Sequence, residues 1–327
     1  MPCVISTELK THTHGGNMKA NILIGLTLIL GVLLFNRLSV ADNSFDLTNT
    51  SVPRNLIMSG GPDKDGIPSL DTPKFISNND VDFLHNSDRV LGINYLGIQK
   101  AYPIKILNYH EVVNDDFHGN PITITFCPLC RSGIAYSANI KGEKHSFGVS
   151  GLLYNSDVLL YDRQTESLWS QIMSTAISGL LKGYRLTTIP IQNTTWQDWK
   201  QQHPGTQVLS TETGYLRDYT TNPYIGYELD NSIWFPVASR DNSHHPKALV
   251  IGIEIDGKFK AYPFSELEQI NGDLIDQFAG ENLVIQFNSE FQSARIMDNH
   301  DKELSSVTTF WFAWHAFHPQ GEVYKTK

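Results

Sequence analysis

The sequence predicts a mainly β fold with few short helices, in which one β-rich unit occurs twice and the second copy is degenerate. Three observations support this prediction. Most apolar segments are short and alternate with polar residues at a period of two. Turns that contain glycine, such as Lys141-Gly142, separate these segments. Several motifs of the first half recur in the same order in the second half.

The predicted elements follow one another at short intervals. Val90–Tyr95 and Gln99–Tyr102 form a hairpin, and a helix over Pro103–Asn108 follows because proline is favoured at the first helical position. A second helix, Thr195–Gln202, ends where proline follows at position 204. The other expected strands are Ile122–Phe126, the hairpin Ile134–Ile140 with Lys144–Val149, and the hairpin Val158–Asp162 with Ser167–Gln171.

The duplication rests on motifs that keep one spacing. Val90-Leu-Gly-Ile and Ala101-Tyr-Pro correspond to Val250-Ile-Gly-Ile and Ala261-Tyr-Pro in the second half. We therefore divide the chain into an N-terminal extension with a signal peptide or anchor (1–41), a lead-in segment (42–84), a first repeat (85–210), a connector (211–245) and a degenerate second repeat (246–325).

Only the first repeat carries reactive side chains. His110, Glu111, Cys127 and Cys130 align with Asn271, Gly272, Asn288 and Phe291, and the second repeat also lacks most of residues 148–171. A residue needed for packing would be expected in both copies, so this asymmetry indicates a functional site in the first.

Composition narrows the partners. Acidic residues number 34 against 25 basic ones, a formal net charge of −9, and no run of Lys and Arg occurs. This balance argues against nucleic acid as a partner. We expect a small-molecule or envelope-component substrate, with membrane contact only through an uncleaved N-terminal segment.

The N-terminal region is typical of a secretory signal. Lys19 precedes an apolar stretch over residues 20–35, and Ser39-Val-Ala41 provides small residues for cleavage before Asp42. We expect an exported protein of the periplasm or cell envelope, cleaved near Ala41. The alternative is an uncleaved membrane anchor over residues 20–35.

The motif Cys127-Pro-Leu-Cys130 directly follows a predicted strand and allows three interpretations. It can ligate a metal, form a local structural disulfide, or take part in thiol chemistry. His110 is the candidate third ligand, because two thiolates and one imidazole leave a position open on zinc, copper or iron. Glu111 is a candidate base or orienting group beside it.

A third cluster follows over residues 150–171. Asp157, Asp162 and Arg163 lie among Leu, Tyr and Trp, where polar groups must be paired or used, and we take them as candidate catalytic residues. The simpler interpretation is a polar turn beside a solvated strand. His145 and His203 are expected to be structural.

The motifs resemble those of a bacterial and archaeal family known as domain of unknown function 3179. The resemblance covers roughly residues 60–325, and Arg131 stands where members usually have glycine after the second cysteine. The family carries no known activity. The segments that carry the resemblance are Asp65-Gly-Ile-Pro-Ser-Leu, Asn108-Tyr-His-Glu-Val-Val-Asn-Asp, Phe126-Cys-Pro-Leu-Cys, Phe147-Gly-Val-Ser-Gly-Leu-Leu-Tyr-Asn-Ser-Asp, Leu160-Tyr-Asp-Arg-Gln-Thr-Glu-Ser-Leu-Trp-Ser-Gln and Phe310-Trp-Phe-Ala-Trp.

Two hypotheses follow. In the first, an exported protein binds a transition metal through Cys127, Cys130 and His110 for redox or hydrolytic chemistry. In the second, the protein is a non-catalytic binding or scaffolding module of the envelope, with a structural Cys127–Cys130 disulfide. The sequence leaves open whether the protein is an enzyme.

Overall fold

The computed structural model describes residues 45–326. The predicted signal peptide or anchor, its cleavage site and Cys3 lie outside the described residues. Among the residues it does describe, every helix is too short or too polar to cross a membrane.

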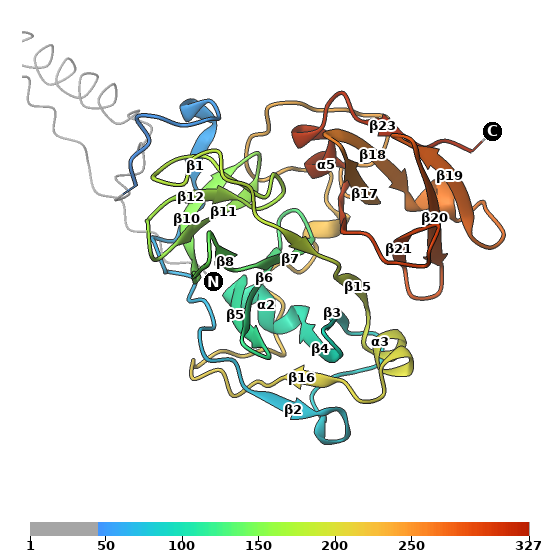
Figure 1. Ribbon diagram of the computed structural model, residues 1–327, viewed down its shortest axis with the longest axis horizontal. Helices are drawn as coiled ribbons and strands as arrows, with labels where there is room; N and C mark the ends of the chain where they lie inside the picture. The colour runs from blue at the N-terminus through green and yellow to red at the C-terminus, as the bar shows by residue number, and fades with distance from the viewer. Residues whose placement is uncertain (1–44, 327) are drawn as a thin grey trace, which may run out of the picture. The chain divides into compact units, whose positions relative to one another are not determined.

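The fold is mainly β, as predicted (Figure 1). Five sheets of three to five strands hold most of the strands, and a two-stranded ribbon adds β8 (Asn139–Ile140) and β9 (Glu143–Lys144). The helices are short: α2 (Ile104–His110), α3 (Trp196–Gln202), α4 (Phe264–Leu267) and α5 (Trp311–Phe317), with 3-10 turns η1 (Arg54–Leu56), η2 (Asn78–Asp80) and η3 (Tyr227–Leu229).

The strands of the lead-in segment and of the first repeat form three sheets. In order across each sheet, these are β15 (Gln192–Thr195), β3 (Arg89–Tyr95), β4 (Ile98–Pro103), β16 (Gln207–Leu209) and β2 (Phe75–Ser77); then β14 (Thr188–Ile189), β7 (Ser132–Ser137), β6 (Asn120–Cys127) and β5 (Val112–Phe117); then β1 (Ile57–Ser59), β10 (Phe147–Tyr154), β11 (Asp157–Asp162), β12 (Leu168–Ser170) and β13 (Thr175–Ala176).

The C-terminal segment, coloured orange to red in Figure 1, forms two further sheets. These are β22 (Ser306–Phe310), β17 (Leu249–Ile255), β18 (Lys258–Pro263) and β23 (Glu322–Val323); then β19 (Leu274–Phe278), β20 (Glu281–Asn288) and β21 (Ser293–Asp298).

The two segments compared in the sequence make corresponding strand pairings. In the first, β3 pairs with β4 and β15 in antiparallel fashion, and β4 pairs with β16 in parallel. In the second, β17, β18, β22 and β23 repeat these directions. Gly92 lies opposite Ala101, and Gly252 lies opposite Ala261, so the registers also agree.

Side-chain contacts correspond as well. The indole ring of Trp199 lies against Gly92, and that of Trp314 lies against Gly252. Tyr102 donates to Asp115 at 2.5 Å, while Tyr262 donates to Asp276 at 2.8 Å. A lysine two residues before each tyrosine pairs with the same aspartate. The strands that correspond in the two segments therefore carry one buried polar network in each.

The sheet built on β10, β11 and β12 lies between β7 and β15 in the chain, at the place where the second segment runs directly from β21 to β22. We call it the inserted sheet.

In this region the structure differs from the predicted hairpin of residues 134–140 with 144–149. Only Ile140 and Asn139 pair with Glu143 and Lys144, and the chain from Phe147 onward pairs with β11 and β1 instead. The hydrophobic run Phe147–Leu153 is buried on both faces, which a central strand allows and a hairpin edge does not.

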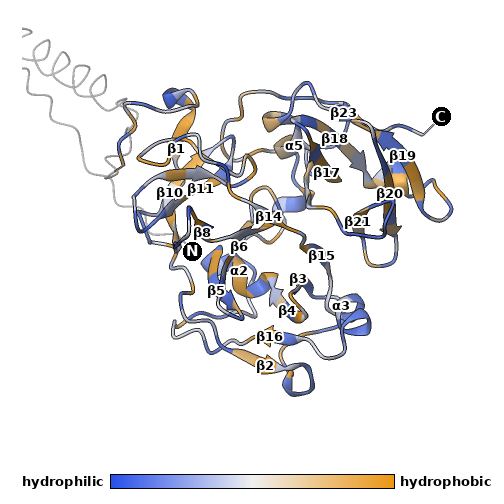
Figure 2. Ribbon diagram, in the orientation of Figure 1, coloured by the Kyte–Doolittle hydropathy of each residue, from blue (hydrophilic) through white to orange (hydrophobic). Residues whose placement is uncertain are grey.

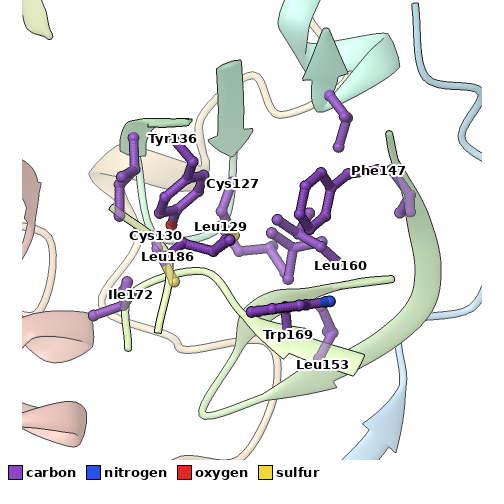
Figure 3. Close-up of a cluster of buried hydrophobic side chains, with 14 of the residues drawn as sticks. Cys127, Leu129, Cys130, Tyr136, Phe147, Leu153, Leu160, Trp169, Ile172 and Leu186 are labelled. Carbon is purple, nitrogen blue, oxygen red and sulfur yellow. The ribbon is translucent and has the colours of Figure 1, made fainter. Parts of the chain in front are cut away.

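The hydrophobic cores lie between these sheets, and Figure 2 shows apolar residues as short stretches on the strands. The largest cluster joins the inserted sheet, the β6–β7 turn and Phe310 with Phe312 of the C-terminal segment. The candidate site lies in this cluster, with Cys127 and Cys130 among its members (Figure 3).

Candidate functional site

The β6–β7 turn positions both cysteines. The last pair of this hairpin joins Cys127 to Ser132, so the residues between them form a tight loop. Arg131 closes the loop with φ of 56°, a left-handed conformation that glycine adopts at lower cost. The Cys130 carbonyl accepts from Phe310 N at 2.9 Å and from Thr309 Oγ1 at 2.8 Å, so the C-terminal segment also holds the loop.

A second turn, between β10 and β11, brings in Asp157. Tyr154 pairs with Asp157, and the two residues between them, Asn155 and Ser156, have φ of 53° and 64°. Positive φ at both central residues is typical of the type I′ hairpin turn. The Asn155 side chain fixes the turn, because it accepts from Ala238 N at 2.8 Å and donates to the Ala316 carbonyl at 3.2 Å.

Cys127, Cys130 and Asp157 meet in a buried group. One ligand atom from each lies within 4.8 Å of the other two, and the three residues are at most 2% exposed. Both cysteines are free thiols, and their Sγ atoms lie 3.9 and 3.4 Å from the Ser156 carbonyl. Asp157 Oδ2 accepts from Ile172 N at 3.1 Å, but its buried Oδ1 has no hydrogen-bond partner among the described residues.

Glu111 lies beside this group, at the C-cap of α2 and 6% exposed. Its φ of 55° is left-handed, whereas the aligned position of the second repeat is Gly272, with φ of 90°. Burial, and then the negative charge of Asp157, raise the pKa of Glu111 to about 8. The first repeat therefore places a buried carboxyl group on a backbone conformation that favours glycine.

Burial favours the protonated form of the acidic groups of the site. Burial raises the pKa of Asp157 to about 7 and raises that of the Cys127 and Cys130 thiols above their ordinary value. The charge of Lys247 interacts with Cys130, but its Nζ already donates to the carbonyls of Tyr227, Asp230 and Ser232 at 3.1, 3.1 and 2.7 Å. A divalent cation could replace the protons and satisfy the thiolates and Asp157 Oδ1 together.

Two tyrosines of the connector were not predicted as site residues. Burial and the neighbouring acidic groups raise the pKa of both: Glu111 and Cys127 act on Tyr224, and Cys130 and Cys127 act on Tyr227. The Tyr227 hydroxyl is buried without a hydrogen-bond partner among the described residues. Nothing local in the connector indicates this role, because it depends on contacts with strands about 100 residues earlier.

The group contains Asp157, and His110 does not complete it. Both imidazole nitrogens of His110 already have partners: Nδ1 lies 2.8 Å from the Pro68 carbonyl and Nε2 lies 2.6 Å from the Tyr219 hydroxyl. Burial lowers the pKa of His110, which favours the neutral ring in this setting. The third donor beside the cysteines is thus a carboxylate that we expected to be catalytic.

Asp162 and Arg163 lie elsewhere. Asp157 begins β11 and Asp162 ends it, so at about 3.3 Å per residue their backbones are roughly 16 Å apart. Asp162 contacts His145 and Trp169, and Arg163 contacts Asp71 and Ser69. The sequence cluster of residues 150–171 therefore contributes to two separate places.

The donor set fits a transition metal. Thiolate sulfur favours zinc, copper(I) and iron, whereas zinc also accepts carboxylate oxygen. Two thiolates and one carboxylate from two adjacent turns therefore suit zinc best.

Comparison with known proteins identifies a family but no activity. A family model described as "protein of unknown function (DUF3179)" matches residues 64–321. No curated protein matches the chain. No solved structure matches it either. Because the family model covers most of the chain, and includes both cysteines, Glu111 and Asp157, the protein belongs to the DUF3179 family.

Proposed function

We propose that this protein binds one zinc ion through Cys127, Cys130 and Asp157. One observation carries the proposal: Asp157 Oδ1 is buried without a partner beside two buried free thiols. An unsatisfied buried acceptor costs about 1–3 kcal/mol, so a fold that keeps one beside two thiols gains from a cation there.

Glu111 gives the site a further acid–base group. Its carboxyl group interacts with Asp157, and its pKa of about 8 lets it hold a proton at neutral pH and pass it to a molecule bound in the site. When bound, zinc would supply Lewis-acid chemistry of the kind used in hydrolysis. The proposal thus favours hydrolytic over redox chemistry.

Metal analysis with a free-thiol count tests the proposal. We expect about one zinc per chain in the purified protein, and loss of zinc in Cys127→Ser and Asp157→Asn. Asp71→Asn is the matched control for loss of a carboxylate, because Asp71 pairs with Arg163 rather than with the cysteines, and it should keep its zinc. His110→Gln should also keep it, which separates the aspartate from the histidine as third ligand.

The opposite result has a clear form. A protein without stoichiometric metal, in which Cys127 and Cys130 fail to react as thiols until reduced, would contradict the proposal. It would favour the envelope binding module with a structural disulfide, whose sulfurs lie about 2.05 Å apart.

We also propose that the protein is exported. The supporting observation is the order of Lys19, the apolar residues 20–35 and Ser39-Val-Ala41. N-terminal sequencing of the protein recovered from the cell envelope should find Asp42 as the first residue. A chain that still begins at Met18 or earlier would indicate an anchor instead.

A further inference from the structure

A groove of about 560 Å³ lies at the other end of β11. His145, Arg163, Lys144, Asp71 and Asp116 are among the residues that line it. The sequence suggested a structural role for His145, and the zinc proposal uses neither this residue nor the groove.

His145 is held by a carboxylate that accepts several hydrogen bonds. Its Nδ1 lies 3.0 Å from Asp162 Oδ1, and Asp162 is fully buried. Asp162 also accepts from Thr165 N at 2.8 Å, Thr165 Oγ1 at 2.7 Å and Trp169 Nε1 at 3.0 Å. The Asp162 carboxylate is thus surrounded by donors and has no hydrogen of its own to give. Nδ1 of His145 therefore carries the ring hydrogen and donates it to Oδ1 in a hydrogen bond.

This arrangement leaves Nε2 of His145 as the nitrogen with a free lone pair. Among the described residues, Nε2 has no hydrogen-bond partner, and it is not one of the buried unsatisfied atoms. Since His145 lines the groove and is 5% exposed, its open nitrogen faces a space that a ligand can enter. An imidazole oriented by a buried carboxylate is the arrangement used for general bases.

The charges of the groove limit what it can bind. Arg163 pairs with Asp71 at 2.9 Å, and Lys144 pairs with Asp116 at 3.6 Å. Both cations of the lining are therefore matched by carboxylates, and the groove offers no unpaired positive charge to a phosphate or carboxylate. An uncharged ligand fits better, and Ile122, Pro121 and Ala138 provide it with an apolar wall.

We propose that His145 is the general base of a second site, which hydrolyses uncharged esters, and that Asp162 is its positioning residue. Nε2 accepts a proton from water as the water oxygen bonds to the ester carbonyl carbon. The bond from that carbon to the alcohol oxygen then breaks, and the proton passes to the leaving alcohol. One ester and one water give one acid and one alcohol, and the imidazole returns to its starting form.

Hydrolysis of 4-nitrophenyl acetate by the purified full chain tests this proposal. We expect His145→Gln to lower the rate at least tenfold, whereas His118→Gln, which removes an exposed histidine of the β5–β6 turn, should not change it. Asp162→Asn should lower kcat with little change in KM, which a purely structural role would not produce. The charged 4-nitrophenyl phosphate should not be hydrolysed, and chelation of metal should leave ester hydrolysis intact.

A rate for His145→Gln within a factor of three of the unmodified protein would overturn the proposal, and so would loss of hydrolysis on chelation. Diethyl pyrocarbonate provides a measurement that needs no variant, because it modifies neutral imidazole nitrogens. Modification of His145 should proceed in step with loss of ester hydrolysis. Failure of His145 to react while His118 is fully modified would show that Nε2 is closed to the groove.

Discussion

Glu111 carries two structural costs that the aligned glycine of the second repeat avoids. The second repeat has Gly272 at the aligned position, and both residues have positive φ. Glutamate there adds a left-handed conformation, which costs about 1 kcal/mol, and a buried carboxyl group whose pKa is raised to about 8 by burial and by Asp157. A residue with two such costs is best explained by what its carboxyl group does in the site.

We therefore expect Glu111→Gly to stabilise the metal-free protein by about 1 kcal/mol and to weaken zinc-dependent function. Urea denaturation of the metal-free protein measures the first effect. Lys141→Gly is the control, because Lys141 has φ of 54° in an exposed turn and carries no buried carboxyl group. Its gain should be smaller than that of Glu111→Gly. A less stable Glu111→Gly protein would show that the carboxyl group supports the fold.

At the scale of elements, the sequence predicted the hairpins and helices that depend on residues close together in the chain. The hairpin of β3 and β4 follows from period-two alternation on both sides of Leu96-Gly97, and its strands pair directly across this turn, with Tyr95 opposite Ile98. Helix α3 begins after Thr195, whose side chain accepts from Asp198 N as an N-cap. The contact of Asp157 with Cys127 could not be predicted in this way, because it depends on how the inserted sheet packs on the β6–β7 turn. His145 was judged structural because the sequence does not reveal that Asp162 holds one of its ring nitrogens.

The packing of α3 and α5 on their sheets gives a prediction at this scale. A methyl group on Gly92 would overlap the indole ring of Trp199, and one on Gly252 would overlap that of Trp314. Both rings are buried, so the strand or the helix must move. We expect Gly92→Ala and Gly252→Ala each to lower the free energy of unfolding by about 2 kcal/mol.

Gly205→Ala is the matched control, since the nearest atom to its added Cβ is 3.7 Å away. It should change the stability by less than about 0.5 kcal/mol. Similar losses for Gly92→Ala and Gly252→Ala would support the duplication energetically. A neutral effect at only one of them would show that the two segments pack differently despite their shared register.

For the molecule as a whole, the site lies where four parts of the chain converge. The β6–β7 turn provides the cysteines, and the inserted sheet provides Asp157. The connector covers them with Tyr224 and Tyr227, and Phe310 of the C-terminal segment binds the Cys130 carbonyl. Protonation at this point, and the metal binding that we propose, would therefore act on the stability of the described fold rather than on one loop.

The metal-free protein should lose stability as the pH rises above neutral. Glu111 and Asp157 have ordinary pKa values of 4.5 and 3.8, which burial raises to about 8 and about 7 in the folded state. From about pH 4 to 8 the folded protein thus binds more protons than the unfolded chain. For each such extra proton, the free energy of unfolding falls by up to about 1.4 kcal/mol for every unit of pH. His110 and His318 act in the opposite direction, because burial lowers their pKa, but only below about pH 6.5.

Urea denaturation at pH 7 and pH 8.5 isolates the carboxyl groups from these histidines. We expect the metal-free protein to be less stable at pH 8.5 by on the order of 1 kcal/mol, and Glu111→Gln to reduce this difference. With zinc the trend should reverse, because the ion binds the deprotonated ligands and its affinity rises as protons leave. A metal-free protein that gains stability over this range would mean that Glu111 and Asp157 are already ionised at pH 7, and that the buried acids do not need a cation.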